Sequence, residues 1–195
     1  MRLIGITGGV GMGKSTAASW LRDQGLPLVD TDDLAREVVT PGSPGLAEVV
    51  AVFGAGILLD DGSLDRPALA SRVFSEPEDR RRLEAILHPR IHALWQAAAG
   101  RWRGEAEAVG FVVIPLLFEK GYAGEFDATV TVACTRASQR RRLQDRGWTD
   151  AQLAGRLAAQ LPVEEKIGLA SQVVWTEGSR QAHYRQWRRL LDLGL

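Results

Sequence analysis

Near its amino end, the chain has a glycine-rich loop that carries a lysine and a serine at a spacing suited to phosphate binding. Four residues separate Gly8 from Gly13, and Lys14 and Ser15 follow at once, which gives the pattern G-x-x-x-x-G-K-S. Glycines let main-chain N–H groups curl around an anion, the lysine neutralises phosphate charge, and the serine hydroxyl is a ligand for Mg²⁺. The candidate phosphate-binding residues are Gly8, Gly9, Gly11, Met12, Gly13, Lys14, Ser15 and Thr16.

The segments on either side of this loop fit the same chemistry. The apolar run over residues 3–7 predicts a buried parallel strand, and the apolar spacing over residues 14–24 predicts a helix that ends before Gly25. A helix that starts at the loop adds its dipole and its first N–H groups to the site. We therefore expect the chain to bind the triphosphate of ATP, with Mg²⁺ held at Ser15.

A second predicted strand, over residues 28–30, leads into an acidic turn. Asp30 and Asp32 lie at its carboxyl end, which in a parallel sheet is the end that also carries the phosphate loop. A carboxylate there can take the proton of an attacking hydroxyl group, and Asp32 is the stronger candidate. The alternative is that the turn only caps a helix over residues 34–40.

The sequence separates the kinases from other nucleotide-binding proteins. GTP-dependent switches need Asp-x-x-Gly and Asn-Lys-x-Asp segments, yet no Asp has a Gly three residues later and the chain contains no Asn. ATP-driven motors place an acidic residue at the end of a hydrophobic strand, and Glu119 is a displaced candidate for it. The residues therefore favour a small-molecule kinase and leave an ATPase or an ATP-binding regulatory protein open.

Strands that alternate with helices predict an α/β fold with a parallel five-stranded sheet flanked by helices. We expect one domain over residues 1–195. No strong strand pattern occurs over residues 33–105, so this part is predicted to be a helical insertion beside the sheet. The expected strands lie near residues 3–7, 28–30, 111–117, 128–134 and 173–176.

Arginines in the second half of the chain are candidates for screening the transferred phosphoryl group. Arg142 and Arg146 are four residues apart in a helix expected over residues 137–146, and Arg156 lies in the next one, over residues 150–160. Guanidinium groups that close over a triphosphate stabilise its developing charge. The plainer interpretation is a solvated basic face in a chain with 21 Arg and three Lys.

Composition bounds the partners. Formal net charge is zero, which argues against nucleic acid, and no apolar run reaches membrane-spanning length. Cys134 is the only cysteine and lies in an apolar run, so we expect a buried structural thiol. Met1 and Arg2 lead directly into a predicted strand, not a signal peptide. We expect a cytoplasmic monomer.

Several segments together resemble the dephospho-CoA kinase family along nearly the whole chain. The phosphate loop alone is shared with many families, but the set in this order is specific. The matching segments are Ile4 to Thr16, Val29 to Asp32, Ala35 to Val39, Leu87-His88-Pro89-Arg90-Ile91, Pro115-Leu116-Leu117-Phe118-Glu119 and Arg156-Leu157-Ala158-Ala159-Gln160.

The resemblance implies transfer of the γ-phosphoryl group of ATP to the ribose 3′-hydroxyl of dephospho-CoA. It also implies a fold like that of the nucleoside monophosphate kinases, with residues 33–105 binding the acceptor and residues 136–166 forming a lid. By the same resemblance Asp32 is the base, and His88, Arg90 and Glu119 line the acceptor side. His88 could instead brace a helix, and Glu119 could be a fixed salt-bridge partner. A related kinase with a nucleoside or nucleoside monophosphate acceptor is the alternative.

One segment departs from the family pattern. Near the last strand the family has Ala-Asp-x-Val-Ile-x-Asn-x-Gly, whereas this chain has Ser171 and Thr176 in place of the Asp and the Asn. The resemblance places this segment beside the adenine, so the change bears on the base contacts and leaves the phosphate chemistry untouched.

Overall fold

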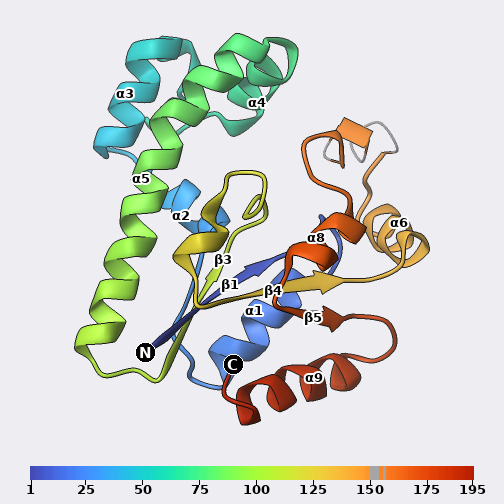
Figure 1. Cartoon of the computed structure of the whole chain (residues 1–195). Coiled ribbons are helices and arrows are strands. Elements are labelled where there is room, and N and C mark those ends of the chain that lie inside the picture. The colour runs from blue at the N-terminus through green and yellow to red at the C-terminus, as the bar shows by residue number, and fades with distance from the viewer. Residues whose placement is uncertain (150–153, 156) are drawn as a thin grey trace. The chain divides into compact units, whose positions relative to one another are not determined.

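The computed structural model describes residues 1–149, 154–155 and 157–195. The chain divides into two compact units (Figure 1). The first, which we call the sheet unit, contains Met1–Asp30 and Arg101–Leu195. The second, the helical unit, contains Thr31–Gly100.

The sheet unit is built on five parallel strands in the order β2-β3-β1-β4-β5, which confirms the predicted fold class. Because all five strands run the same way, their carboxyl ends meet at one edge of the sheet. That edge carries the phosphate loop, which follows β1. The strands are β1 (Arg2–Thr7), β2 (Leu28–Asp30), β3 (Val109–Val113), β4 (Ala128–Ala133) and β5 (Gln172–Trp175).

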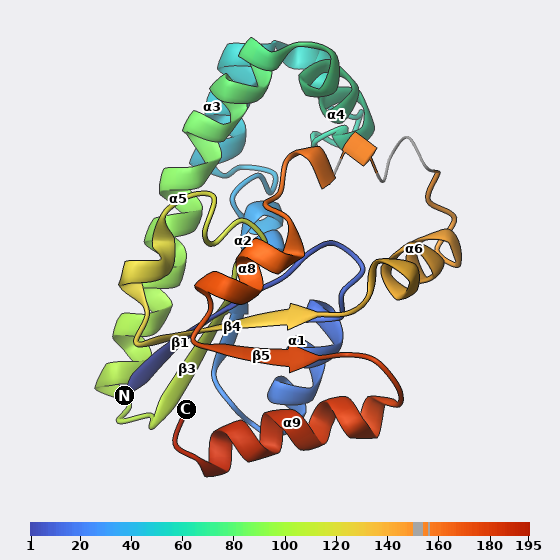
Figure 2. The same ribbon diagram turned by 45° about the vertical axis from the view of Figure 1, so that its right-hand side comes forward.

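Helices cover both faces of this sheet. Helices α1 (Lys14–Asp23) and α9 (Arg180–Asp192) lie on one face, and α8 (Val163–Leu169) lies on the other (Figure 2). Strands β1 and β4 are buried almost throughout, as expected for central parallel strands with few polar residues. In the core the ring of Phe111 meets that of Trp187 edge to face, with centroids 6.4 Å apart.

Strand β3 differs from the prediction at both ends. It begins at Val109 and ends at Val113, whereas the apolar run predicted a strand over residues 111–117. A turn starts at Pro115, where proline has no N–H to continue a central ladder. The Lys120 N–H then donates to the carbonyl of Leu116 at 3.1 Å. The apolar residues from Pro115 to Leu117 are therefore part of a partly buried turn.

The helical unit has its own hydrophobic core. Ser43 caps α3 by accepting from the Leu46 N–H (3.1 Å), and Asp65 caps α4 by accepting from the Ala68 N–H (2.9 Å). Buried side chains include Val49, which is fully buried. The helices of this part are α2 (Thr31–Glu37), α3 (Pro44–Phe53), α4 (Arg66–Ser75) and α5 (Pro77–Gly104), with a short 3₁₀ turn at Ala55–Ile57. The end of α5, from Arg101 on, belongs to the sheet unit.

Helix α2 starts at Thr31, three residues before the predicted start at residue 34. The prediction was a helix over residues 34–40 with the acids before it, but Asp32 and Asp33 lie inside the first turn. Carboxylates are stabilised there by the helix dipole. The acidic residues are thus part of the helix.

The predicted lid is described in part. Helix α6 (Arg136–Gln144) ends two residues earlier than expected, and the chain turns at Gly147, whose φ is 78°. The helix predicted over residues 150–160 falls partly on positions 150–153 and 156, which lie outside the described residues. Helix α8 (Val163–Leu169) was not predicted at all.

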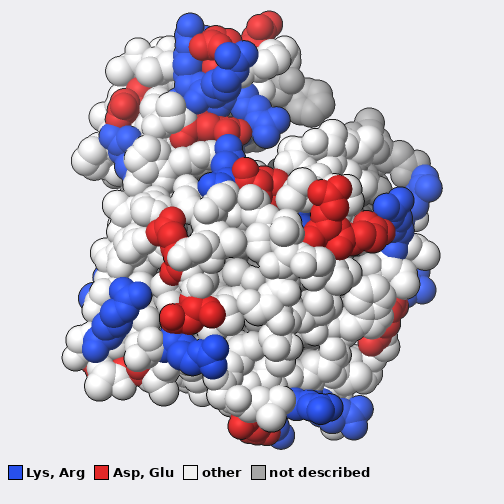
Figure 3. Space-filling view, in the orientation of Figure 1, with Lys and Arg blue, Asp and Glu red and all other residues white. Residues whose placement is uncertain are grey.

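Charges of both signs are spread over the face of the molecule drawn in Figure 3. This agrees with the zero net charge of the sequence. Among the described residues, no helix combines the length and the apolar character needed to span a membrane.

Candidate phosphate-binding site

The glycine-rich loop joins the end of β1 to the start of α1. Gly8 has a φ of 144°, and a Cβ atom there would lie 2.2 Å from the Val132 carbonyl oxygen of the neighbouring strand. Gly13, with a φ of 102°, is left-handed at the N-cap of α1. Both positions therefore require glycine. A loop of this kind, leading into a helix N-terminus, is a main-chain cradle for an anion.

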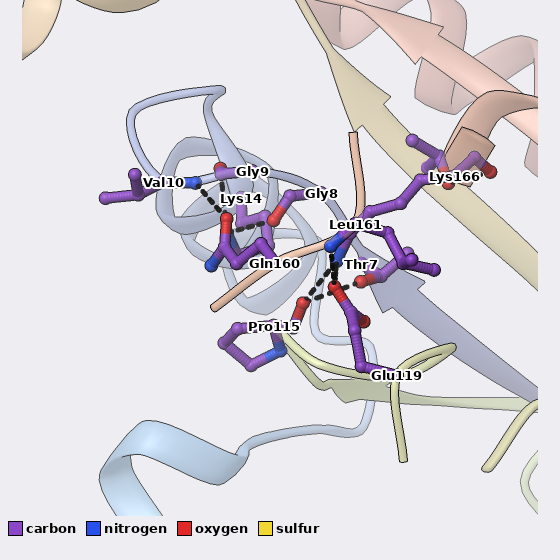
Figure 4. Close-up of polar contacts among 11 residues, drawn as sticks. Thr7, Gly8, Gly9, Val10, Lys14, Pro115, Glu119, Gln160, Leu161 and Lys166 are labelled. Carbon is purple, nitrogen blue, oxygen red and sulfur yellow. Dashed lines mark hydrogen bonds and ion pairs between the residues drawn. The ribbon is translucent and has the colours of Figure 1, made fainter. Parts of the chain in front are cut away.

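Lys14 turns back over the loop (Figure 4). Its Nζ donates to the carbonyl oxygens of Gly8 at 2.6 Å and Gly9 at 3.0 Å. These contacts hold the ammonium group beside the phosphate loop, where it is expected to bind phosphate. Ser15 is exposed and Thr16 half-buried in the first turn of α1. The structure thus gathers all the predicted phosphate-binding residues from Gly8 to Thr16 in one loop and helix turn.

Two glutamines hold the peptide groups of Val10 at the tip of the loop. The Val10 N–H donates to Gln160 Oε1 at 3.3 Å, and the Val10 carbonyl accepts from Gln139 Nε2 at 2.7 Å. Gln139 is a buried residue of α6, and Gln160 comes from the segment before α8. Neither glutamine was singled out from the sequence, since a lone glutamine has no spacing signature.

Thr176, the residue that follows β5, is hydrogen-bonded to the phosphate loop. Its hydroxyl donates to the Met12 carbonyl (2.9 Å), with a longer contact to the Ala133 carbonyl (3.2 Å). Arg142 Nη1 donates to the same hydroxyl at 2.9 Å, and its Nη2 donates to the Thr176 carbonyl. The predicted lid arginine Arg142 is therefore hydrogen-bonded to Thr176, and Thr176 in turn contacts the phosphate loop.

The start of α6 is tied to the same loop after β5. Glu177 Oε1 accepts from the N–H and the hydroxyl of Thr135, both at 2.8 Å, and its Oε2 accepts from the Ser138 hydroxyl at 2.8 Å. These hydrogen bonds lower the pKa of Glu177. The segment that departs from the family pattern thus has structural partners on α6.

Ser171 lies at the edge of the sheet opposite the phosphate loop. It precedes β5, at the amino ends of the strands, whereas the loop lies at their carboxyl ends. There it forms a reciprocal pair with Thr129, through Thr129 N to Ser171 Oγ (3.1 Å) and Ser171 N to Thr129 Oγ1 (3.2 Å). The side chain of Ser171 thus extends strand pairing at the edge of the sheet opposite the phosphate loop.

Glu119 takes part in a buried ion pair. Its Oε1 lies 2.8 Å from Lys166 Nζ and accepts the Leu161 N–H at 2.8 Å (Figure 4). Lys166 is 0% exposed and also donates to the Pro115 carbonyl at 2.7 Å. Burial lowers the pKa of Lys166, although Glu119 opposes this shift. The structure thus agrees with the alternative interpretation of Glu119 as a fixed salt-bridge partner, and its place on the acceptor side stays a prediction.

The other predicted arginines have different surroundings. Arg146 is exposed beyond the end of α6, so the expected shared helix face with Arg142 is wrong. The helix stops at Gln144, before the second arginine is reached. Arg156 lies outside the described residues.

Three predicted site residues belong to the helical unit. Asp32 is exposed in the first turn of α2, two residues after β2 ends. His88 and Arg90 are half-buried on α5. Arg90 forms an ion pair with Glu48 and donates to the Ile86 carbonyl at 2.8 Å.

A cavity of about 530 Å³ borders the phosphate loop within the sheet unit. Gly9 and Met12 of the loop, Gln139 of α6, and Gln160 and Leu161 contribute to its wall. Volumes of this size accommodate a small-molecule ligand.

Cys134 is buried away from solvent, as expected, and burial raises the pKa of its thiol.

Lys166 is the main feature of this region that the sequence alone did not suggest. The available signal was its rarity, since the chain has three lysines and 21 arginines. A rare lysine between Glu165 and Ile167 could have prompted a search for a buried acidic partner.

Comparison with known proteins identifies the family. A model of the family described as Dephospho-CoA kinase matches residues 2–181. A dephospho-CoA kinase of Anaeromyxobacter dehalogenans is 47% identical over 98% of this chain and 91% of its own length. The corresponding protein of Geobacter metallireducens is 45% identical over 98% of both chains.

Solved structures agree in fold. A protein of Thermus thermophilus, TT1252, is 37% identical with a TM-score of 0.83 and covers 98% of this chain and 96% of its own. The dephospho-CoA kinase of Campylobacter jejuni has a TM-score of 0.72 at 23% identity and covers 99% of this chain and 98% of its own. The second likeness concerns the fold alone.

Proposed function

Since this chain belongs to the dephospho-CoA kinase family, we propose that it transfers the γ-phosphoryl group of ATP to the ribose 3′-hydroxyl of dephospho-CoA. The products are coenzyme A and ADP, and the reaction is the last step of coenzyme A synthesis. The observation that carries the proposal is the family match over residues 2–181, combined with the built phosphate loop from Gly8 to Ser15.

The phosphates of ATP bind the loop in this proposal. Main-chain N–H groups at the start of α1 face the anion, and the helix dipole favours its charge. Lys14, already turned toward the loop carbonyls, neutralises the β and γ phosphates. Phosphoryl transfer needs little covalent chemistry from the protein, so positioning and charge stabilisation account for most of the rate.

The surroundings of Ser15 fit a magnesium ion held mainly by substrate. Its hydroxyl is exposed in the first turn of α1, and the described residues contain no cluster of three or more His, Cys, Asp or Glu that could cage a metal. Mg²⁺ in kinases is commonly held by few protein oxygens together with phosphates and water. When bound, it neutralises charge on the transferred group.

Asp32 takes the proton of the attacking hydroxyl. Its place two residues beyond β2 supports this role, because β2 ends at the sheet edge that carries the phosphate loop. The carboxylate is exposed and belongs to a short acidic helix turn. A positioned base of this kind contributes about 10²–10⁴ in rate.

The helical unit supplies the acceptor-binding residues in this proposal. His88 and Arg90 contact dephospho-CoA, and Arg142, Arg146 and Arg156 stabilise the charge that develops during transfer. Residues 136–166 form the lid of a single kinase domain that acts as a cytoplasmic monomer. Glu119 acts within the protein, as its ion pair with Lys166 supports.

ADP release measured with a panel of acceptors tests the proposal. Dephospho-CoA, adenosine, AMP and no acceptor would be compared at saturating Mg-ATP. Release that depends on dephospho-CoA supports the proposal, and faster release with adenosine or AMP points to the related kinase class. Equal release in every arm would mean that no kinase reading of this chain is right.

A further inference from the structure

We propose that Gln160 is a positioning residue for phosphoryl transfer, which fixes the tip of the phosphate loop and is itself held in place by the buried Lys166–Glu119 pair. The inference rests on the proposed kinase function and assigns work to residues outside the loop motif. Figure 4 shows the polar contacts that connect the tip of the phosphate loop with this ion pair.

The first step is the contact at the loop tip. The Val10 N–H can only donate, so the atom of Gln160 that faces it at 3.3 Å must be the side-chain oxygen. On the other side the Val10 carbonyl can only accept, so Gln139 presents its NH₂ group at 2.7 Å. Two side chains from different segments thus fix the peptide groups on either side of one Cα atom.

The second step is the main chain beside Gln160. The next N–H group, that of Leu161, donates to Glu119 Oε1 at 2.8 Å. An anchor one residue from the side chain leaves Gln160 little freedom to move away from the loop. Glu119 therefore acts on the phosphate loop through Gln160 without touching it.

The third step is the anchor of Glu119. Lys166 Nζ lies 2.8 Å from the same carboxylate oxygen and donates to the Pro115 carbonyl at 2.7 Å. That carbonyl also accepts the Thr7 hydroxyl at 3.1 Å, and Thr7 directly precedes Gly8. The chain of contacts begins at the base of the phosphate loop and returns to its tip.

Energetics favour a positional role for the pair. A fully buried lysine is costly to desolvate. Replacing a buried ion pair by hydrophobic residues of similar volume often leaves a protein as stable as before or makes it more stable. Glu119 Oε2 is also buried and has no hydrogen-bond partner among the described residues. Misplacing a reacting group by about 1 Å can cost on the order of 10² in rate. Precise placement of the loop is the gain that such a pair offers.

Gln160→Met tests the contact at the loop. Methionine has a similar length and no amide oxygen, and Gln160 is half-buried, so folding should be preserved. The expected result is about a 5–10-fold weaker affinity for ATP, the loss typical of one hydrogen bond. The KM for dephospho-CoA should stay within about twofold. The matched control is Gln144→Met, at an exposed glutamine that ends α6, which should leave both values unchanged.

Glu119→Gln tests the action through Gln160. Glutamine keeps an acceptor for the Leu161 N–H and nearly the same volume, while the charge that anchors Lys166 is lost. ATP affinity should fall by a smaller factor than in Gln160→Met. The double variant should bind ATP no more weakly than Gln160→Met alone, because Glu119 reaches the tip of the phosphate loop through that side chain.

Affinity for ATP measured by calorimetry without acceptor separates this inference from the proposed function. Wild-type protein that binds ATP but phosphorylates no dephospho-CoA would refute the proposed function and leave the comparison of variants intact. Unchanged ATP affinity in Gln160→Met would overturn the inference. So would losses in the two single variants that multiply in the double variant, since Glu119 would then act independently of Gln160.

Discussion

Arg142 donates hydrogen bonds to both the hydroxyl and the main-chain carbonyl of Thr176. The same hydroxyl donates to the Met12 carbonyl of the phosphate loop at 2.9 Å. Thr176 is 6% exposed, so these hydrogen bonds form away from water. The residue that departs from the family's asparagine is therefore a structural link between α6, β5 and the loop. This link explains how the substitution can be accommodated in the phosphate region.

Thr176→Val should destabilise the protein and loosen the loop. Valine keeps the shape but leaves the buried Met12 carbonyl and one Arg142 donor without their partner, which costs about 1–3 kcal/mol in the free energy of unfolding. Urea unfolding followed by circular dichroism measures this cost, and the KM for ATP should rise in parallel. Thr40→Val, at an exposed hydroxyl that donates to the Glu37 carbonyl, is the control. Equal stability of the two variants would argue against the link.

Stability should depend on pH through His183. This residue is 3% exposed and accepts the Trp187 indole N–H at Nε2, 3.0 Å away. Burial, assisted by the positive charge of Arg142, lowers the pKa of His183 to about 4 from 6.5. Between these values the unfolded chain binds a proton that the folded chain does not. Stability should therefore fall as pH drops from 6.5 toward 4, by about 3 kcal/mol in total.

Urea unfolding at a series of pH values between 4.5 and 7.5 measures this slope. The variant His183→Gln offers an acceptor to Trp187 but does not titrate, so its stability should vary less with pH than that of the wild type. Carboxylates contribute equally to both proteins and cancel in the difference. Identical slopes would show that His183 is not the group responsible.

Lys166→Met should be among the most destabilising single changes. It leaves the Glu119 carboxylate buried without its cation, and breaking a buried pair in this way costs about 3–5 kcal/mol. The double variant Lys166→Met/Glu119→Gln should recover part of the loss, because the unpaired charge is gone. Thermal unfolding compares both with Lys120→Met, which removes an exposed lysine. A loss no larger than that of Lys120→Met would contradict the assigned burial cost.

Asp32→Asn should reduce kcat by about 10²–10⁴ and change ATP affinity little, because a base acts in the transition state. Steady-state kinetics with dephospho-CoA measures both. Asp33→Asn is the matched control, since Asp33 lies in the same helix turn and pairs with Arg36 at 2.8 Å. Near-normal turnover of Asp32→Asn would remove this residue from the mechanism.

The sequence predicted the parts that depend on local pattern. Apolar runs and glycine spacing were sufficient for the five-stranded parallel sheet and for the phosphate loop. The end of β3 was misplaced because Ile114 and Leu117, which follow Val113 outside the strand, are buried as completely as they would be in a strand. Periodicity does not distinguish these two environments.

Long-range polar partners could not be read from the sequence. The pair formed by Lys166 and Glu119 joins residues 47 positions apart in number, from α8 and the turn after β3. Gln160 reaches Val10 across 150 positions. Such contacts depend on how the elements pack, so the sequence left a salt-bridge role of Glu119 as an alternative and did not name Lys166 as its partner.

The most direct measurement of the central claim is the product of a reaction with ATP labelled with ¹⁸O in the γ-phosphoryl group. Wild-type protein, Mg-ATP and dephospho-CoA should give labelled coenzyme A, identified by mass spectrometry as carrying the new phosphate on the ribose 3′ oxygen. Lys14→Met should form this product far more slowly. Label found only in free inorganic phosphate would contradict the account, since the protein would then hydrolyse ATP without transferring the group.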